Sequence, residues 1–373
     1  MLFSRRRALQ LLSGTVAGGI MPLSSPIAGD DDVAFLSANA DRQKQFHAAG
    51  LTPAGNIAFE MRIPQRGHGV ATHPSGREAV IFARRPGNFA FVFDCKLGHK
   101  IRFLQSPTGS HFYGHGVYSK DGRHLFSTEN NYGDGRGFIG VWDTQRGYQR
   151  MGRWASGGIG PHELVLSQDG KQLIVANGGL RTHPETGRQK LNIPTMQPSL
   201  TFLDIKNGTI AASYKFEQSR LRFLSIRHLA VNKSGDVCIA MQDQGPRHDL
   251  VPLVALFRRG SNRLQLLAAP EATTLRFKGY AGATKMDESG RFVAMSAPRG
   301  DRIAFWDAKD GKFLTETRLV DGCGVAGTGV EGEFVATSGT GKVIKIENLT
   351  GPTLKINSEQ TSNRFWDNHL TRL

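Results

Sequence analysis

The sequence predicts a seven-bladed β-propeller, an all-β fold in which the C-terminal strand closes the N-terminal blade. Three observations support this prediction. A unit of four short strands recurs along the chain, a turn glycine follows the first strand of each unit, and no helical periodicity is found beyond residue 28. Units of four antiparallel strands every ~40 to 66 residues are typical of propellers, and residues 29–373 contain about seven of them.

The first 28 residues have the pattern of an export signal. A basic segment, Ser4-Arg5-Arg6-Arg7-Ala8-Leu9-Gln10, is followed by a weakly apolar stretch and then by Pro26-Ile27-Ala28. The paired arginines followed by Leu9 resemble the twin-arginine signal. We therefore expect residues 1–28 to be a twin-arginine signal peptide and residues 29–373 to form a single periplasmic propeller domain. An exported protein is separated from nucleic acid, so we expect no nucleic-acid partner.

Each repeat unit has the same order of strands and turns. The first strands of six blades are predicted to begin at His68, His115, His162, His228, near Gly282 and at Cys323. A tight turn such as Lys120-Asp121-Gly122 follows, in which Asp supports the bend and Gly takes a positive φ. The third strand ends in an acidic residue, as in Ile139-Gly140-Val141-Trp142-Asp143, and a glycine stands four residues later.

The seventh blade is expected to be split between the two ends of the sequence. Residues 33–64 have the pattern of its outer strands, and residues 367–373 have the pattern of its inner strand. Pairing these two segments removes two exposed sheet edges and ties down both ends of the ring.

Side chains that bind metals are predicted to converge at one mouth of the channel. The first strand of each blade lies next to the channel, and alignment of the Gly-Val pairs places six ligand-type residues at one equivalent position: His68, His115, His162, His228, His369 and Cys323. Clustered imidazoles depress one another's protonation, which favours the neutral form that binds metal. Imidazoles suit copper, iron, zinc or nickel, and a thiolate would shift the preference toward copper or iron. In the alternative interpretation the histidines only hydrogen-bond neighbouring loops and Cys323 is inert packing.

Loops between the second and third strands are expected to wall a basin over the same mouth. They comprise residues 84–88, 128–134, 177–198, 242–249 and 299–301. Glu129, Asn130, Gln242 and Asp243 are the candidates on these loops for orienting imidazoles or binding a cofactor or substrate. Glu163 directly follows His162 and should point away from it in a strand, so we interpret it as a structural partner.

Composition and motifs exclude several classes of protein. The 373 residues include 47 Lys and Arg against 32 Asp and Glu, a net charge of +15. This charge favours an acidic partner or an anionic surface, although a solvated basic face without a partner has the same composition. Three distant cysteines form neither a zinc knuckle nor a disulfide framework. The chain has no run of ~18 apolar residues for a stable membrane span, no nucleophile elbow, no phosphate loop and no dinucleotide fingerprint.

The motifs resemble one known family. The twin-arginine start, the Gly-His-Gly-Val repeats, Thr128-Glu129-Asn130 followed by residues 137–143, and Asp367-Asn368-His369 are similar to the bacterial periplasmic domain of unknown function 1513 family. The resemblance covers essentially the whole chain and implies a propeller like those of the quinoprotein amine dehydrogenase and YVTN-repeat group. Members of this family often lie beside imelysin-like and dihaem peroxidase-like proteins, as in iron-uptake systems. The resemblance therefore implies iron or copper handling, with such metal-uptake proteins as partners.

The leading hypothesis is a periplasmic propeller that binds iron or copper at the histidine-lined mouth and is accessory to metal acquisition. Two alternatives stay open. One is a lactonase-like hydrolase or redox enzyme that uses the same basin, with Glu129 as the carboxylate to test. The other is a non-catalytic scaffold for protein interaction, which the basic charge and broad loop face would also serve.

Overall fold

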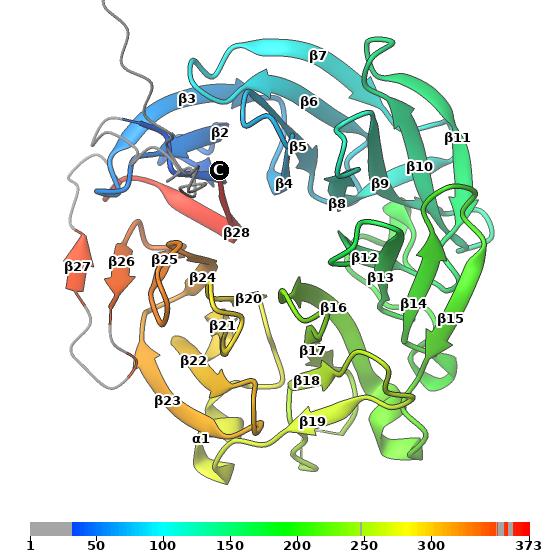
Figure 1. The fold of residues 1–373 in the computed structure, drawn as a ribbon, viewed down its shortest axis with the longest axis vertical. Coiled ribbons are helices and arrows are strands. Elements are labelled where there is room, and N and C mark those ends of the chain that lie inside the picture. The colour runs from blue at the N-terminus through cyan, green and yellow to red at the C-terminus, as the bar shows by residue number, and fades with distance from the viewer. Residues whose placement is uncertain (1–31, 247, 348, 350–353, 357–360) are drawn as a thin grey trace, which may run out of the picture.

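The computed structural model describes residues 32–246, 248–347, 349, 354–356 and 361–373. The predicted signal peptide, residues 1–28, lies outside the described residues. Within them the chain forms seven four-stranded antiparallel sheets. Figure 1 shows these sheets as blades around one central axis, so the prediction of a seven-bladed β-propeller is confirmed.

Each blade has one strand at the axis and three strands further out. Blade 1 contains β28 (Phe365–Arg372), β1 (Phe35–Ala40), β2 (Phe46–Leu51) and β3 (Ile57–Ile63). Blade 2 contains β4 (Gly67–Thr72), β5 (Glu78–Ala83), β6 (Phe89–Asp94) and β7 (Lys100–Gln105). Blade 3 contains β8 (Ser110–Tyr118), β9 (His124–Asn131), β10 (Gly137–Asp143) and β11 (Gln149–Ala155). Blade 4 contains β12 (Pro161–Leu166), β13 (Gln172–Asn177), β14 (Ser199–Asp204) and β15 (Ile210–Tyr214).

The remaining blades repeat this arrangement. Blade 5 contains β16 (Leu224–Val231), β17 (Val237–Asp243), β18 (Val254–Phe257) and β19 (Gln265–Leu267). Blade 6 contains β20 (Ala283–Met286), β21 (Phe292–Ala297), β22 (Arg302–Asp307) and β23 (Phe313–Arg318). Blade 7 contains β24 (Gly322–Gly327), β25 (Phe334–Ser338), β26 (Val343–Ile346) and β27 (Leu354–Ile356). Every inner strand contacts the inner strands of both neighbouring blades, so the seven form a closed ring.

The helices of the described residues are short and lie between strands. They are α1 (Glu271–Arg276) and four single 3₁₀ turns, η1 (Pro184–Thr186), η2 (Ile193–Thr195), η3 (Ser219–Phe223) and η4 (Pro298–Gly300). None of the helices in the described ranges has the length and apolar character needed to cross a membrane.

Burial explains the residue pattern of the strands. The second strand of a blade is covered on both faces, so β5 is almost continuously apolar and buried, whereas the outermost strand β7 is mostly exposed. The cores lie between adjacent sheets that pack face to face. Between blades 2 and 3, for example, the large buried side chains of Phe82, Phe112 and Trp142 belong to one cluster.

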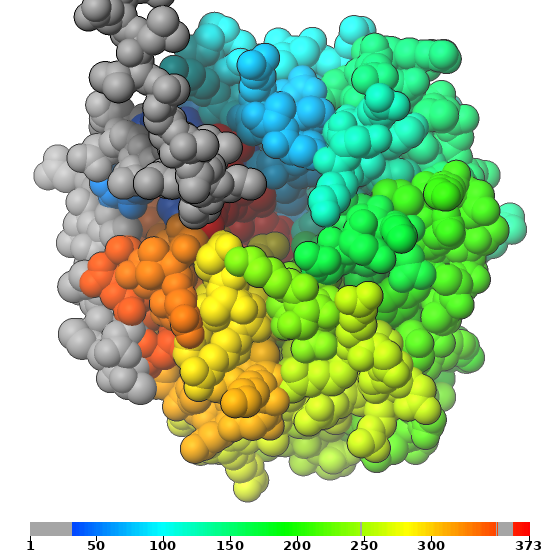
Figure 2. Space-filling model, viewed as in Figure 1, coloured from blue at the N-terminus to red at the C-terminus, as the bar shows by residue number. Residues whose placement is uncertain are grey.

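The ring is closed by pairing strands from the two ends of the sequence, as predicted. β28 pairs antiparallel with β1. The Ser37 hydroxyl on β1 donates a hydrogen bond of 2.6 Å to the main-chain oxygen of His369. The buried Trp366 side chain on β28 packs in one cluster with Phe35 and Val335, which belong to blades 1 and 7. In Figure 2 the visible face is hollowed at its centre, and atoms of the C-terminal strand, in red, lie in the hollow.

Two inner strands begin earlier than predicted. β8 begins at Ser110 and β16 at Leu224, ahead of the histidines that were expected to start them. The extra residues pair with the second strand of the same blade, since Ser110 lies opposite Asn131 and Leu224 lies opposite Asp243. The histidines therefore lie inside these two strands rather than at their first residue.

Irregular pairing of the inner strands positions the residues that face the axis. In six blades the register between the inner and second strands shifts near the predicted histidine or cysteine. Five of these shifts lie on the inner strand, at Gly67/Val70, Phe112/Gly116, Pro161/Glu163, Ile226/His228 and Gly322/Val325. In blade 1 the shift lies at Ser37/Asn39 on β1, opposite the inner strand β28. β20 in blade 6 pairs without a shift, and it is the blade without a ligand-type side chain there. Such a β-bulge changes the direction in which neighbouring side chains point.

Candidate metal centre

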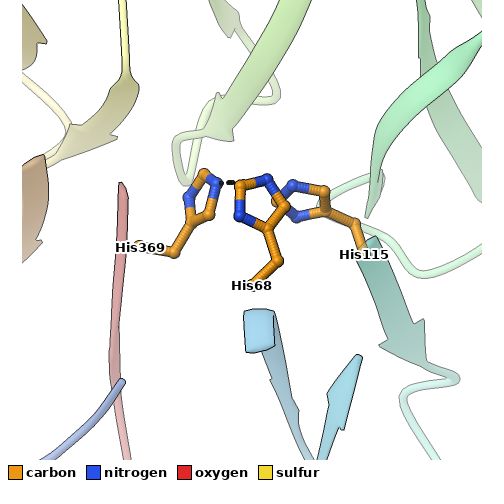
Figure 3. Close-up of side chains that lie close together, drawn as sticks. All are labelled: His68, His115 and His369. Atoms are coloured by element: carbon orange, nitrogen blue, oxygen red, sulfur yellow. Dashed lines mark hydrogen bonds between the residues drawn. The ribbon is translucent and has the colours of Figure 1, made fainter. Parts of the chain in front are cut away.

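The five predicted histidines converge at the axis. His68, His115, His162, His228 and His369 come from five inner strands, and each is only 2% to 7% exposed. The ring centre of His369 lies 4.4 Å from that of His68, 4.5 Å from His115 and 4.7 Å from His228. His162 completes the cluster at 4.9 Å from His228. Figure 3 shows His68, His115 and His369 pointing toward one another from separate strands.

The histidines do not share one strand position, which corrects the predicted alignment. The last residues of four inner strands to pair before the hairpin are Thr72, Tyr118, Leu166 and Val231. His68 and His162 stand four residues before these, whereas His115 and His228 stand three residues before them. Because of the bulges, residues from two successive positions reach the same centre, so the Gly-Val pairs are not equivalent markers.

A buried carboxylate orients His68. The Nδ1 atom of His68 lies 2.7 Å from Oδ1 of Asp367, and the other carboxylate oxygen, Oδ2, accepts a hydrogen bond from Nε of Arg66. Burial alone would raise the pKa of Asp367, but His68 and the Arg84 and Arg66 charges hold it below its usual range. An ionised carboxylate can only accept, so His68 carries its proton on Nδ1 and directs the lone pair of Nε2 into the cluster.

A second carboxylate, Glu163, serves two other histidines. One of its oxygens lies 3.0 Å from Nδ1 of His228, and the other lies 3.8 Å from Nδ1 of His115. Burial raises the pKa of Glu163, but His115, the hydrogen bond from His228 and the Lys285 charge lower it to about 2. His228 therefore also presents its Nε2 lone pair. As predicted, Glu163 does not contact the adjacent His162; its partners belong to the neighbouring blades.

Burial keeps the imidazoles neutral. Desolvation lowers the pKa of His68 to about 4, although the Asp367 charge opposes this shift. Desolvation, followed by the charges of the other histidines, also holds the pKa of His369 well below its ordinary value. Desolvation likewise holds the pKa of His115 well below its ordinary value, although the Glu163 charge raises it. Neutral imidazole is the form that binds a metal ion.

The nitrogen positions fit a metal ion. Ligand atoms of His68, His115 and His369 all lie within 4.8 Å of one another. The Nε2 atoms of His68 and His369 are 3.3 Å apart, and a tetrahedral ion with bonds of about 2.0–2.1 Å separates its nitrogens by about 3.3 Å. Nε2 of His115 is buried and has no hydrogen-bond partner among the described residues. A metal ion would satisfy this atom, since buried polar groups are normally paired.

A second group of three histidines is less suited to bind an ion. His115, His162 and His228 also place ligand atoms within 4.8 Å of one another. However, a guanidinium nitrogen of Arg227 donates to Nδ1 of His162 over 3.2 Å. Arginine can only donate, so the Nδ1 lone pair of His162 accepts this hydrogen bond. Neutral His162 then carries its proton on Nε2, and neither ring nitrogen has a free lone pair for a metal ion. His68, His115 and His369 are therefore the group better suited to hold an ion, and the ring centre of His228 lies 4.7 Å from that of His369.

A cavity adjoins His115 and His369 on the side of the axis opposite the strand starts. It has a volume of about 180 Å³, and its lining includes His115, His369, Glu163 and Lys285. An ion held by His68, His115 and His369 would have this open space beside two of its ligands, which would leave a coordination position for water or another small molecule. The same arrangement suits either reversible uptake of an ion or polarisation of a bound molecule.

Comparison with known proteins identifies the family. The family described as "Protein of unknown function (DUF1513)" matches residues 61–373. The chain belongs to this family. No curated protein matches it significantly in sequence. Among solved structures, hydrazine synthase of Kuenenia stuttgartiensis is similar, with a TM-score of 0.62 and 13% identity over 89% of this chain and 100% of that chain. At this identity the likeness shows the propeller fold alone.

In this DUF1513 protein Cys323 lies in the expected inner strand, β24, but its thiol contacts Asp321 rather than the histidines. Its Sγ donates to the main-chain oxygen of Asp321 over 3.0 Å. Burial and the negative charges of Asp321 and Asp367 raise the pKa of the thiol well above its ordinary value. Metals bind the thiolate, and among the described residues Cys323 belongs to neither group of clustered ligand atoms. We therefore leave it out of the proposed ligand set.

The four predicted cofactor-binding residues contact other parts of the DUF1513 chain. Both carboxylate oxygens of Glu129 accept hydrogen bonds of 2.7 Å from Arg150. Asn130 contacts Nε2 of His111, Gln242 donates to the main-chain oxygen of Ala281, and Asp243 pairs with Arg220. The contacts found for these residues thus do not join them to the histidine cluster.

Sequence reasoning missed the three residues that set the state of the imidazoles. The sequence predicts Asp367 only as part of the closing strand and of the family motif and Glu163 only as a structural partner, and it predicts no role for Arg227. Each lies one or two residues from a cluster histidine, so charged neighbours of the histidines are the signal that would have identified them. Only the structure shows that Glu163 and Arg227 act on histidines of other blades.

Proposed function

We propose that this protein binds one transition-metal ion, iron or copper, through His68, His115 and His369. The observation that carries the proposal is the unpartnered Nε2 of His115, buried beside two imidazoles whose nitrogens are already spaced as ligands. Asp367 supports the site because histidine ligands commonly donate their second ring proton to a carboxylate, and the Glu163 carboxylate places a negative charge 3.8 Å from Nδ1 of His115.

We infer that the protein works in the periplasm as an accessory to metal acquisition. Export by the twin-arginine signal in residues 1–28 is part of this proposal, as are imelysin-like or dihaem peroxidase-like partners. Both rest on the sequence and on the family resemblance. The cavity beside His115 and His369 supports a carrier role, since an ion with only three protein ligands keeps a position for a ligand from a partner.

Metal titration of the purified protein tests the binding site. Untagged protein is treated with EDTA and dialysed, then titrated with Cu(II) in air and with Fe(II) without oxygen, using calorimetry. We expect one ion per chain, and nitrogen couplings in the electron paramagnetic resonance spectrum of the copper complex. His115→Ala should lower the affinity at least 100-fold.

Two variants are matched controls for this titration. His111 is also a buried histidine of β8, but it bonds to Phe112 and Asn130 outside the cluster, so His111→Gln should leave the affinity unchanged. His162→Ala should lower it less than 10-fold, because Arg227 occupies the Nδ1 of His162. No stoichiometric binding by wild type, or equal losses in His111→Gln and His115→Ala, would refute the proposed site.

A further inference from the structure

Cationic side chains crowd the mouth of the axis where the inner strands begin. Arg227 stands in β16, while Arg85, Lys190 and Arg299 come from the loops or turns between second and third strands in blades 2, 4 and 6. These loops lie at the histidine end because the second strand ends where the inner strand begins, as Gly67 opposite Ala83 shows. The four cations thus reach one mouth from four blades.

Contacts connect these cations around two tyrosines. The guanidinium carbon of Arg85 lies 5.6 Å from the ring centre of Tyr113, and that of Arg299 lies 4.4 Å from the ring centre of Tyr280. Tyr113 in turn lies against His162, with ring centres 6.2 Å apart, and His162 accepts the hydrogen bond from Arg227. Arg85 and Arg227 are therefore joined through Tyr113 and His162, while Arg299 stands over Tyr280.

Arg227 is a buried cation without an anion. Its residue is 3% exposed, its NH1 donates to neutral His162, and its Nε is buried with no hydrogen-bond partner among the described residues. Burial and the nearby Arg85 charge lower its pKa to about 10, so it stays protonated at neutral pH. A buried charge without a counter-ion is strongly unfavourable, and pairing it with an anion relieves that cost.

The carboxylates described near this mouth pair with other cations: Asp243 and Asp249, which line a cavity with Lys190 and Arg299, both pair with Arg220. Asp367 pairs with Arg66 and contacts Arg84, but among the described residues neither Arg227 nor the three loop cations form an ion pair. Lys190 has a neutral partner, Gln244. The positive charges of Arg227, Arg299 and Arg85 even lower the pKa of Lys190, after the effect of burial.

We propose that this mouth binds a small polycarboxylate anion, one carboxylate of which pairs with Arg227. Guanidinium groups bind carboxylates through parallel hydrogen bonds, and Arg227 has an unused donor for such a contact. The other cations come from separate blades, and Arg85 and Arg299 stand beside aromatic rings, so the charges match several spaced carboxylates better than one compact phosphate. The proposal does not depend on a bound metal.

Calorimetry with metal-free protein tests the anion site. The probe is tricarballylate, which carries three carboxylates without a metal-chelating hydroxyl, and acetate and inorganic phosphate are titrated in parallel. The EDTA-treated full chain should bind one tricarballylate at least 10-fold more tightly than either comparison anion, and added salt should weaken binding. Arg227→Gln should weaken it at least 10-fold.

Two less buried positions keep the test decisive if Arg227→Gln fails to fold. Arg85→Gln and Lys190→Gln should each weaken tricarballylate at least 3-fold, whereas Lys120→Gln, an exposed charge in the β8–β9 hairpin at the other end of the blades, should not. His115→Ala should lose metal but keep the anion, so the two sites fail separately. The proposal would be overturned if the protein did not bind tricarballylate or bound phosphate more tightly. Equal tricarballylate affinities in Arg85→Gln, Lys190→Gln and Lys120→Gln would also overturn it.

Discussion

At the scale of single residues, His68 shows how the two ring nitrogens divide their tasks. Nδ1 faces the carboxylate of Asp367 at 2.7 Å, and Nε2 faces the imidazole of His369 at 3.3 Å. The first contact fixes the proton, and the second leaves the lone pair where an ion is proposed to bind. The direction of the His68 lone pair therefore depends on Asp367, which is not among the proposed ligands.

Removing the charge of this carboxylate should weaken metal binding. Asp367→Asn keeps the size of the side chain but makes it a weaker acceptor for the His68 proton, so we expect the Cu(II) affinity to fall about 10- to 100-fold. Calorimetry measures the change, and circular dichroism checks the fold. Asp307→Asn is the matched control, because Asp307 is a buried aspartate paired with Arg291 far from the cluster. Equal effects of the two variants would contradict the assigned role.

A histidine outside the cluster should make stability depend on pH. Burial lowers the pKa of His111 to about 4, although its bond to the Phe112 carbonyl raises it. Its folded-state pKa lies below the unfolded value near ~6.5, so the unfolded chain binds more protons as the pH falls through this range. The free energy of unfolding should therefore decrease from pH 6.5 toward pH 4, by up to about 3 kcal/mol from this residue.

Urea unfolding of wild type and His111→Gln at pH 7 and pH 4.5 measures this contribution. Glutamine keeps hydrogen-bonding capacity but has no titrating group, so the variant should lose less stability between the two pH values. Parallel losses in both proteins would show that His111 does not titrate with a lowered pKa.

At the scale of strands, the bulges and their glycines place the histidines. A Cβ atom on Gly69 would lie 2.6 Å from the main-chain oxygen of Gly114 and 2.7 Å from Nδ1 of His115. A Cβ atom on Gly114 would likewise lie 2.6 Å from Cδ2 of His68. Adjacent inner strands thus approach closely only because glycine stands beside each of these imidazoles.

Filling one of these close contacts should disturb the ligand without removing it. Gly69→Ala should push the His115 ring away and lower the Cu(II) affinity at least 10-fold, as measured by calorimetry. Gly152→Ala on the exposed strand β11 is the control, because nothing lies within 4 Å of a Cβ there. Unchanged affinity in Gly69→Ala would mean that the ring position does not depend on this contact.

The strands also show what sequence alone supports. Repeated turns such as Lys120-Asp121-Gly122 and the split blade predicted the ring correctly, because local turn chemistry and strand length decide them. Convergence of the histidines followed from the same repeat. The bulges could not be predicted, since one extra residue in a strand pair leaves the alternation of apolar and polar residues in the sequence nearly unchanged. Consequently the sequence did not predict that the histidines occupy two successive strand positions, nor that Arg227 contacts His162.

At the scale of the whole molecule, the proposed site and the closure of the ring depend on the same strand. β28 brings His369 and Asp367 to the axis and pairs with β1. It is held by the buried indole of Trp366, which packs with residues of blades 1 and 7. Loosening this strand should therefore affect stability and metal binding together.

Replacing a buried tryptophan in two different blades separates these effects. Trp366→Ala and Trp306→Ala each remove an indole that is at most 2% exposed, and each should cost about 3–5 kcal/mol in the free energy of unfolding. Only Trp366→Ala should also lower the metal affinity, because Trp306 lies in blade 6. Denaturant unfolding and calorimetry measure both quantities; metal affinity that stays at the wild-type value in Trp366→Ala would contradict this coupling.

His68 and His369 stand 301 positions apart in the sequence, and this distance imposes an order on biosynthesis. His68 and His115 are translated early, but the third proposed ligand leaves the ribosome only after six blades have been made. A nascent chain can therefore fold individual blades while the ligand set is still incomplete. If the proposed site binds an ion, loading follows synthesis of β28, and a loaded ion would report that all three proposed ligands have been made.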